Sequence, residues 1–181
     1  MEESDKMKKI IYILTSLIML IAFTSCDEDE EYKTPDQIAT ETQAEIMDCF
    51  LNENQERIKE MLCERCKNLP DIDEQVKKAF EFIDGEIVSY DEEHRASSVG
   101  ASERKDMGGH VSEVITDKGT EYEIGYKAWL TNEENPDLVG VYLICVKNMT
   151  EWKKYDLKKY NQTEQEELYR QCTSSICLPE K

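Results

Sequence analysis

The hydrophobic positions that follow residue 34 recur at steps of three and four, which is the spacing of an amphipathic helix. The first apolar stripe consists of Ile38, Thr42, Ile46, Cys49 and Phe50. It predicts a helix over residues 36–51. Thr34, Pro35 and Gln37 mark its start, because a capping hydroxyl, a proline in the first turn and a reciprocal side chain three residues on form a capping box.

Two further helices are predicted before the pattern changes. After an interruption at residues 52–54, a second helix ends near Lys67, and its apolar positions are Ile58, Met61 and Leu62. A third helix begins at Asp71, and Gly85 supplies its stop. The apolar stripe of this third helix consists of Ile72, Val76, Ala79, Phe80 and Ile83.

Beyond Gly85 the period changes to two, which indicates strands. Strands are predicted over residues 86–90, 111–116, 121–130 and 139–146. The last of these is apolar on both faces, as a central strand would be. The polar, glycine-containing residues 91–110 are predicted as a loop. Helices followed by hairpin-connected strands define an α+β class, with N-terminal helices packed on an antiparallel sheet of about four strands.

A C-terminal extension is predicted over residues 149–181. Its aromatic residues are interleaved with lysines in the run WKKYDLKKY over residues 152–160. A final strand or extended segment with solvent-facing lysines is the predicted structure, and contact with an anionic lipid surface or a cell-wall polymer is the alternative. A capping box from Thr163 to Glu166 predicts a short helix to Gln171, and a tail follows it.

The N-terminal residues have the composition of an export signal. Residues 7–9 are basic, and residues 10–23 form a run of 14 without a charge, shorter than the roughly 20 residues of a membrane-spanning helix. The ending at Cys26 resembles the bacterial lipoprotein box, although Phe23 stands where Leu is usual. The resemblance implies transfer of a diacylglyceryl group, with fatty acids such as palmitate, to the Cys26 sulfur. It also implies removal of residues 1–25 and anchoring by this lipid to the extracytoplasmic face of the cell membrane. An uncleaved anchor and a secreted protein without lipid are the alternatives.

The charge balance of the chain limits the classes of partner that we expect. The chain has 181 residues, with 40 acidic and 22 basic residues and a formal net charge of −18, which argues against a nucleic-acid-binding surface. A mean hydropathy of −0.67 excludes a polytopic membrane protein. Residues 26–33 contain the acidic run DEDEE and are predicted as a solvated linker rather than a calcium site. Residues 34–148 are predicted to form the single folded domain.

Several motifs in this domain resemble a known family. They are DIDEQ at residues 71–75, FEFIDGEIVSY at 80–90, TDKGTEY at 116–122 and NPDLVG at 135–140. In this order they are similar to a family of small bacterial lipoproteins that is known only as a domain of unknown function. The resemblance covers residues 36–148. It implies a nuclear-transport-factor-like or cystatin-like cone, with helices leaning on a curved antiparallel sheet, and it implies no activity.

The two histidines, His94 and His110, are candidates for acid–base chemistry. Both fall in the predicted loop, which begins with acidic residues at positions 91–93. A histidine beside a carboxylate can act as a general base or a metal ligand. A solvated loop without chemistry is the alternative. Because no catalytic motif accompanies these histidines, the sequence predicts no metal site, no cofactor and no assigned catalytic residue.

The cysteines leave more than one interpretation open. Cys63 and Cys66 form a CxxC motif, which is compatible with packing in the core, with a disulfide, or with metal or thiol chemistry. Six cysteines remain after Cys26, and an even number permits bridges in an exported protein. The sequence does not assign pairs among Cys49, Cys63, Cys66, Cys145, Cys172 and Cys177.

The aromatic residues of the predicted strands provide a possible pocket. They are Tyr90, Tyr122, Tyr126, Trp129 and Tyr142. A curved sheet can turn such residues toward a cavity mouth, whereas core packing is the simpler role. The predicted function is therefore that of a surface-tethered, non-catalytic domain that binds a small ligand or an envelope partner. An enzyme of the same architecture and a purely structural envelope protein are the alternatives.

Overall fold

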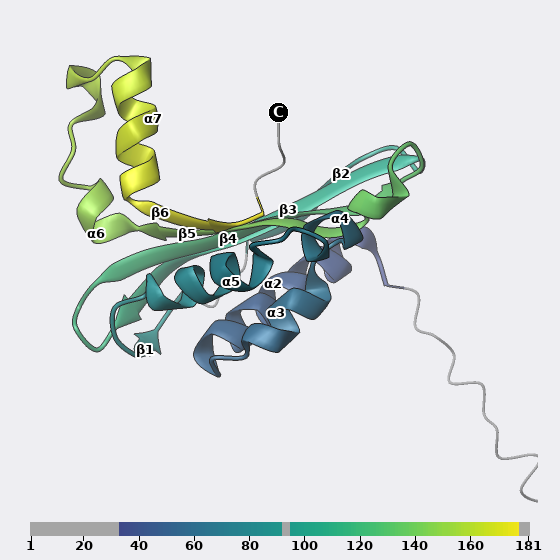
Figure 1. Ribbon diagram of the computed structural model, residues 1–181, viewed down its shortest axis with the longest axis horizontal. Coiled ribbons are helices and arrows are strands. Elements are labelled where there is room, and N and C mark those ends of the chain that lie inside the picture. Colours follow the sequence, from purple (N-terminus) through teal and green to yellow (C-terminus); the bar gives the residue numbers. More distant parts are fainter. Residues whose placement is uncertain (1–32, 92–94, 178–181) are drawn as a thin grey trace, which may run out of the picture. The chain divides into compact units, whose positions relative to one another are not determined.

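The computed structural model describes residues 33–91 and 95–177 (Figure 1). The described residues from Thr34 onward belong to one compact unit. Cys26, the predicted signal and acidic linker, and His94 lie outside the described residues. Within the described ranges, no helix has both the length and the apolar character needed to cross a membrane.

The described residues begin with the helices that the apolar stripes predict. They are α2 (Pro35–Leu51), α3 (Gln55–Met61), α4 (Glu64–Lys67) and α5 (Ile72–Glu81). The capping box at α2 is confirmed, because the Thr34 hydroxyl accepts from the Gln37 amide and the Gln37 side chain accepts from the Thr34 amide. The predicted second helix is interrupted between α3 and α4. Leu62 and Cys63 are extended there, and the Cys63 amide donates to the Val141 carbonyl at 2.8 Å.

The strands form one antiparallel sheet. They are β1 (Ile87–Ser89), β2 (Arg95–Gly100), β3 (Arg104–Thr116), β4 (Glu121–Asn132), β5 (Gly140–Asn148) and β6 (Thr173–Ile176). The order is β1-β3-β4-β5-β6, and β2 pairs with a different part of β3 from the part that β1 occupies. The predicted α+β class, with N-terminal helices on an antiparallel sheet, is confirmed. The sheet has six strands rather than about four.

The predicted loop over residues 91–110 is wrong. Residues from Arg95 onward form β2 and the first half of β3, which pair in an unbroken register from Arg95 opposite His110 to Gly100 opposite Lys105. Gly100 enters the turn with a φ of 127°, which an L side chain rarely adopts. The sequence does not predict these strands because they are built from small and polar residues and therefore lack an apolar pattern. The hydrogen bonds that hold the hairpin together come from the main chain instead.

The helices and the sheet enclose the core between them. Figure 1 shows α2, α3 and α5 on one side of the sheet and α6 (Met149–Trp152) and α7 (Gln162–Gln171) on the other. The fully buried side chains of this layer come from both elements and include Ile46, Ile58, Val76, Val111, Ile124 and Ile144. The alternating burial along β4 follows the predicted inward face, with Tyr122, Ile124, Tyr126 and Ala128 all buried.

The C-terminal extension differs from the extended segment that the sequence predicted. The 3-10 turn η1 (Pro136–Leu138) connects β4 to β5, whereas in the extension α6 is followed by a second 3-10 turn, η2 (Leu157–Lys159). The predicted short helix is present as α7, but its capping box is formed by Asn161 and Glu164, two residues earlier than expected. The expected tail includes β6, which pairs with β5 along Ile144 to Lys147.

Candidate functional site

The candidate site lies on the face of the sheet that α2 does not cover. Alternation along β3 places Met107, Gly109 and Val111 on one face and Asp106, Gly108 and His110 on the other. Met107 and Val111 are buried, and a Cβ at Gly109 would lie 3.0 Å from the side-chain oxygen of Gln43 in α2. The set that contains Asp106 and His110 therefore faces away from α2.

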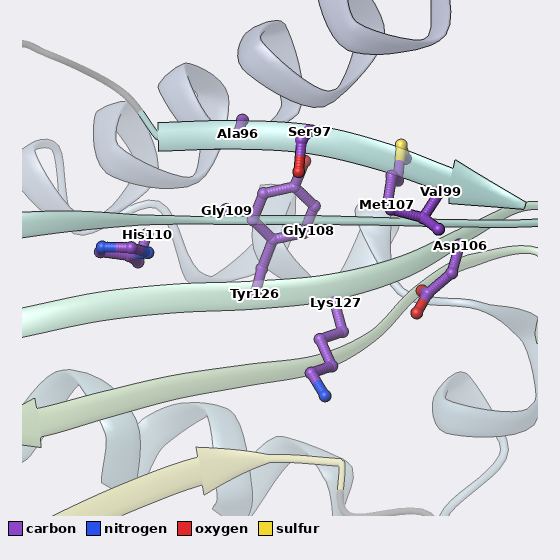
Figure 2. A pocket seen from close by; sticks show the side chains of 10 residues that line it. All are labelled: Ala96, Ser97, Val99, Asp106, Met107, Gly108, Gly109, His110, Tyr126 and Lys127. Carbon is purple, nitrogen blue, oxygen red and sulfur yellow. The ribbon is translucent and has the colours of Figure 1, made fainter.

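A groove of about 600 Å³ runs across this face. Figure 2 shows its lining on three neighbouring strands, β2, β3 and β4. The lining residues are Ala96, Ser97, Val99, Asp106, Met107, Gly108, Gly109, His110, Tyr126 and Lys127. Ser97 is opposite Gly108, and Gly108 is opposite Lys127. The centre of this row carries no side chain, so the surface is hollow between Ser97 and Lys127.

Opposite charges stand at the edges of the groove. Asp106 is half-buried and Lys127 is exposed, and neither enters an ion pair with another residue in the described part of the chain. The Tyr142 hydroxyl donates to Asp106 at 3.4 Å. Burial, and secondarily the negative charge of Asp106, raise the pKa of Tyr142 to about 12, so this hydroxyl stays protonated as a donor. Both charged groups are available to a ligand.

An aromatic stack borders the groove beside Asp106. Trp129 is opposite Asp106 in the β3–β4 register, and its ring stacks on that of Tyr142 with centroids 6.0 Å apart. The Arg104 guanidinium lies 4.8 Å from the centre of the Trp129 ring, within the range of a cation–π contact. The groove therefore combines the Asp106 carboxylate and the Lys127 ammonium group, with an aromatic pair and the Arg104 guanidinium at its border.

Two of the predicted pocket tyrosines, Tyr122 and Tyr126, are buried in the core, although atoms of Tyr126 also line the groove. Tyr122 and Tyr126 are 1% and 3% exposed. The Tyr126 hydroxyl donates to the Ala39 carbonyl at 2.6 Å. The Tyr122 hydroxyl donates to the Phe82 carbonyl and accepts from the Asp84 amide. Burial raises the pKa of Tyr126 to about 12. Both hydroxyls serve to satisfy main-chain groups of the helical layer.

The remaining predicted site residues are distributed differently. Trp129 and Tyr142 share the face with the groove, whereas Tyr90 packs half-buried against the core. His110 lines the groove. It is four residues from Asp106 on the same strand, a distance of about 13 Å along β3. This separation is too large for the two side chains to form a hydrogen-bonded acid–base pair.

Sequence reasoning missed most of the groove because it treated β2 and the first half of β3 as a loop. The groove residues that were not predicted are Ala96, Ser97, Val99, Asp106, Met107, Gly108, Gly109 and Lys127. A usable signal was the glycine pair Gly108-Gly109 within a polar stretch, since glycine inside a strand often marks a close approach or an open surface. In the described ranges, no three His, Cys, Asp or Glu side chains are arranged to hold a metal ion.

The fold and the groove define an α+β domain that has its N-terminal helices on one face of an open sheet and a polar groove on the other. Residues 45–151 match the family described as a domain of unknown function (DUF5104), and the chain belongs to this family. No curated protein matches the chain. The matched region contains every strand that forms the groove, and it leaves out α7 and β6.

Proposed function

We propose that the protein is a membrane-anchored surface lipoprotein whose domain binds a small ligand without changing it chemically. The signal-like N-terminus and Cys26 support the anchor, which would hold the domain on the extracytoplasmic face through lipid. The acidic linker and the net charge of −18 support a domain that stays clear of an anionic envelope. The order of the helices and the sheet is compatible with the cone architecture of nuclear-transport-factor-like and cystatin-like proteins.

The groove beside the Trp129–Tyr142 stack is the observation that carries the binding function. Asp106 offers a carboxylate and Lys127 offers an ammonium group on neighbouring strands, so their chemistry complements a ligand that has both charges. The aromatic stack adds an apolar surface next to Asp106. An amino acid or a short peptide with free termini has these properties. The separation of Asp106 and His110 favours binding over acid–base catalysis.

A peptide pair tests the ligand class. Glycyl-tyrosine should raise the thermal midpoint of the full chain in mild detergent, because a ligand that binds the native state stabilises it. The same dipeptide with an acetylated amino end and an amidated carboxyl end should have no effect. Lys127→Ala and Asp106→Asn should each weaken binding about 10-fold or more, as expected for a lost charged hydrogen bond. Lys158→Ala is the matched control on the exposed turn η2. An equal response to the blocked peptide would contradict the proposal.

Cys26→Ala tests the anchor. In cells supplied with labelled palmitate, the wild-type chain should incorporate label and partition into the membrane fraction, and the variant should do neither. Cys145→Ala is the matched control, because it removes a partly buried thiol of the folded domain. Incorporation that survives Cys26→Ala would show that the lipid is attached elsewhere or that the anchor is of another kind.

A further inference from the structure

Three cysteines from distant parts of the chain meet in the core. Cys63 precedes α4 and Cys66 lies within it, whereas Cys177 follows β6. Their side chains are 1%, 6% and 1% exposed, and all three belong to the same apolar cluster. Because more than a hundred residues separate the CxxC motif from Cys177, only the tertiary fold brings them together.

The CxxC segment and the segment that ends at Cys177 both lie next to strand β5. The Cys63 amide donates to the Val141 carbonyl at 2.8 Å, and the Cys66 thiol donates to the Tyr142 carbonyl at 3.6 Å. Strand β6 pairs with β5, and Ile176 lies opposite Ile144 in this pairing. The residue after Ile176 therefore reaches the same end of β5 as α4.

Cys177 has an unusual backbone conformation, and its side chain is buried. Its φ of 53° is in the left-handed region, which is unfavourable for a residue with a Cβ and persists only where the surroundings hold it. The Cys177 amide donates to the side-chain oxygen of Gln75 in α5 at 2.8 Å. This hydrogen bond holds the chain in the turn while the thiol remains buried.

Cys66 is the centre of the cluster. Cys177 and Cys63 lie close enough to Cys66 for each of them to affect the pKa of its thiol. We propose that Cys66 and Cys177 are a disulfide site that joins the C-terminal strand to α4, with Cys63 as the adjacent third thiol. The proposal goes beyond ligand binding, and it takes from the proposed function only the extracytoplasmic location, where disulfides form and persist.

The bond forms by two thiol–disulfide exchanges with an external disulfide, such as glutathione disulfide or an oxidoreductase of the envelope. One cysteine thiolate attacks the external disulfide, forms a mixed disulfide and releases the first external thiol. The second cysteine thiolate attacks the mixed disulfide, closes the Cys66–Cys177 bond and releases the second external thiol. The cysteine pair loses two electrons and two protons, and the external disulfide is reduced to two thiols.

The burial of the thiols in the folded state determines at which stage this exchange takes place. Contact with Cys177, together with burial, raises the pKa of the Cys66 thiol, and burial raises that of Cys63 to about 11. Thiols with raised pKa values react slowly because the thiolate is the nucleophile. The four-residue strand β6 is at the sheet edge, so exchange is expected while β6 is detached, either before folding is complete or during local opening.

Peptide mapping of the wild-type chain tests the pairing directly. The full chain in mild detergent is equilibrated with reduced and oxidised glutathione, blocked with N-ethylmaleimide and digested with trypsin. Cleavage after Arg65 and Lys67 separates Cys63 from Cys66. The expected product is the dipeptide of residues 66–67 linked to the peptide of residues 171–181, with the bond located at Cys177 by fragmentation. Cys172→Ser removes the other cysteine of that peptide and should leave the link intact.

Other products of the same digest would overturn the proposal. A link between Cys63 and Cys66, a link through Cys172, or complete alkylation of all three thiols in the oxidising buffer would each do so. Retention of stoichiometric zinc by the reduced chain would assign the cluster to metal binding instead. None of these results depends on the groove or on Cys26, so failure here is distinguishable from failure of the proposed function.

Thermal unfolding supplies an independent readout. The bond would close a loop of about 110 residues, and constraint of the unfolded chain should raise the midpoint of the oxidised protein by about 10 °C over the protein reduced with dithiothreitol. Cys66→Ser and Cys177→Ser should abolish this difference, whereas Cys49→Ser should keep it. If the difference survives in both cluster variants, the bond is not at this site.

Discussion

At the residue scale, the alternation of side chains along a strand determines which tyrosines are buried in the core. Hydrogen bonding determines the role of their hydroxyl groups there. Tyr126 is on the inward face of β4, where a hydroxyl without a partner would be costly to bury. Its donation to the Ala39 carbonyl removes this cost and ties β4 to α2. The same side chain that the sequence placed in a pocket is therefore a link between the sheet and a helix.

Tyr126→Phe should lower the free energy of unfolding by about 1–2 kcal/mol, because the Ala39 carbonyl would lose its buried partner. Urea denaturation followed by circular dichroism measures the change. Tyr155→Phe is the matched control in the C-terminal extension, where the ring packs on Tyr160, and it should change the free energy by less than about 0.5 kcal/mol. Equal effects of the two substitutions would contradict the assigned role of the Tyr126 hydroxyl.

At the scale of elements, the start of α2 is joined to the outer strand of the groove. The Asp36 carboxylate accepts from the Ser98 hydroxyl at 2.8 Å and from the Ser98 amide at 2.9 Å. These hydrogen bonds, the hydroxyl first, lower the pKa of Asp36 from its usual value of 3.8. Since Ser98 lies between the groove residues Ser97 and Val99, this contact positions one wall of the groove.

The contact between α2 and β2 should depend on pH with a definite sign. A carboxyl with a lowered pKa in the folded state stabilises the protein above its unfolded pKa, and this contribution is lost as the pH falls through the folded value. Asp36→Asn should lower the urea midpoint at pH 7, and the difference from the wild type should shrink below pH 3.8. In a double-mutant cycle with Ser98→Ala, the two effects should not add. Additive effects would show that Asp36 acts through another partner.

At the scale of the whole molecule, repulsion among the excess acidic residues destabilises the folded state. The net charge is −18. The like charges lie closer together in the folded state than in the unfolded chain, so they repel one another more strongly there. The ion pairs in the described ranges lie largely on the surface, as for Arg65 with Asp137 and Lys77 with Glu81, and such pairs contribute little. Repulsion among the acidic residues is therefore expected to dominate the response to salt.

The thermal midpoint should rise with added sodium chloride. Most of the rise should occur between about 0.01 and 0.15 M, because the Debye length falls from roughly 30 to 8 Å over this range. Scanning calorimetry at constant pH measures it, and an equal concentration of sucrose is the control for solute effects without charge. A midpoint that falls over this range would show that attractive ion pairs outweigh the repulsion.

The local patterns of the sequence were sufficient for α2, for α5 and for the inward face of β4. The stripe of α2, its capping box at Thr34 and the alternation from Tyr122 to Ala128 each depend on neighbours in the chain, and all are present in the structure. The α+β class follows from these elements, because an apolar stripe and an apolar sheet face must cover one another.

The groove and the cysteine cluster depended on pairing between distant segments. Strand β2 has few apolar side chains, so its place in the sheet comes from main-chain bonds to β3, and Gly108 becomes a groove floor only between Ser97 and Lys127. Cys177 reaches Cys66 because β6 pairs with β5. Hydrophobic periodicity records which face of an element is buried, but not which distant strand lies beside it. For this reason the candidate sites emerged only from the folded chain.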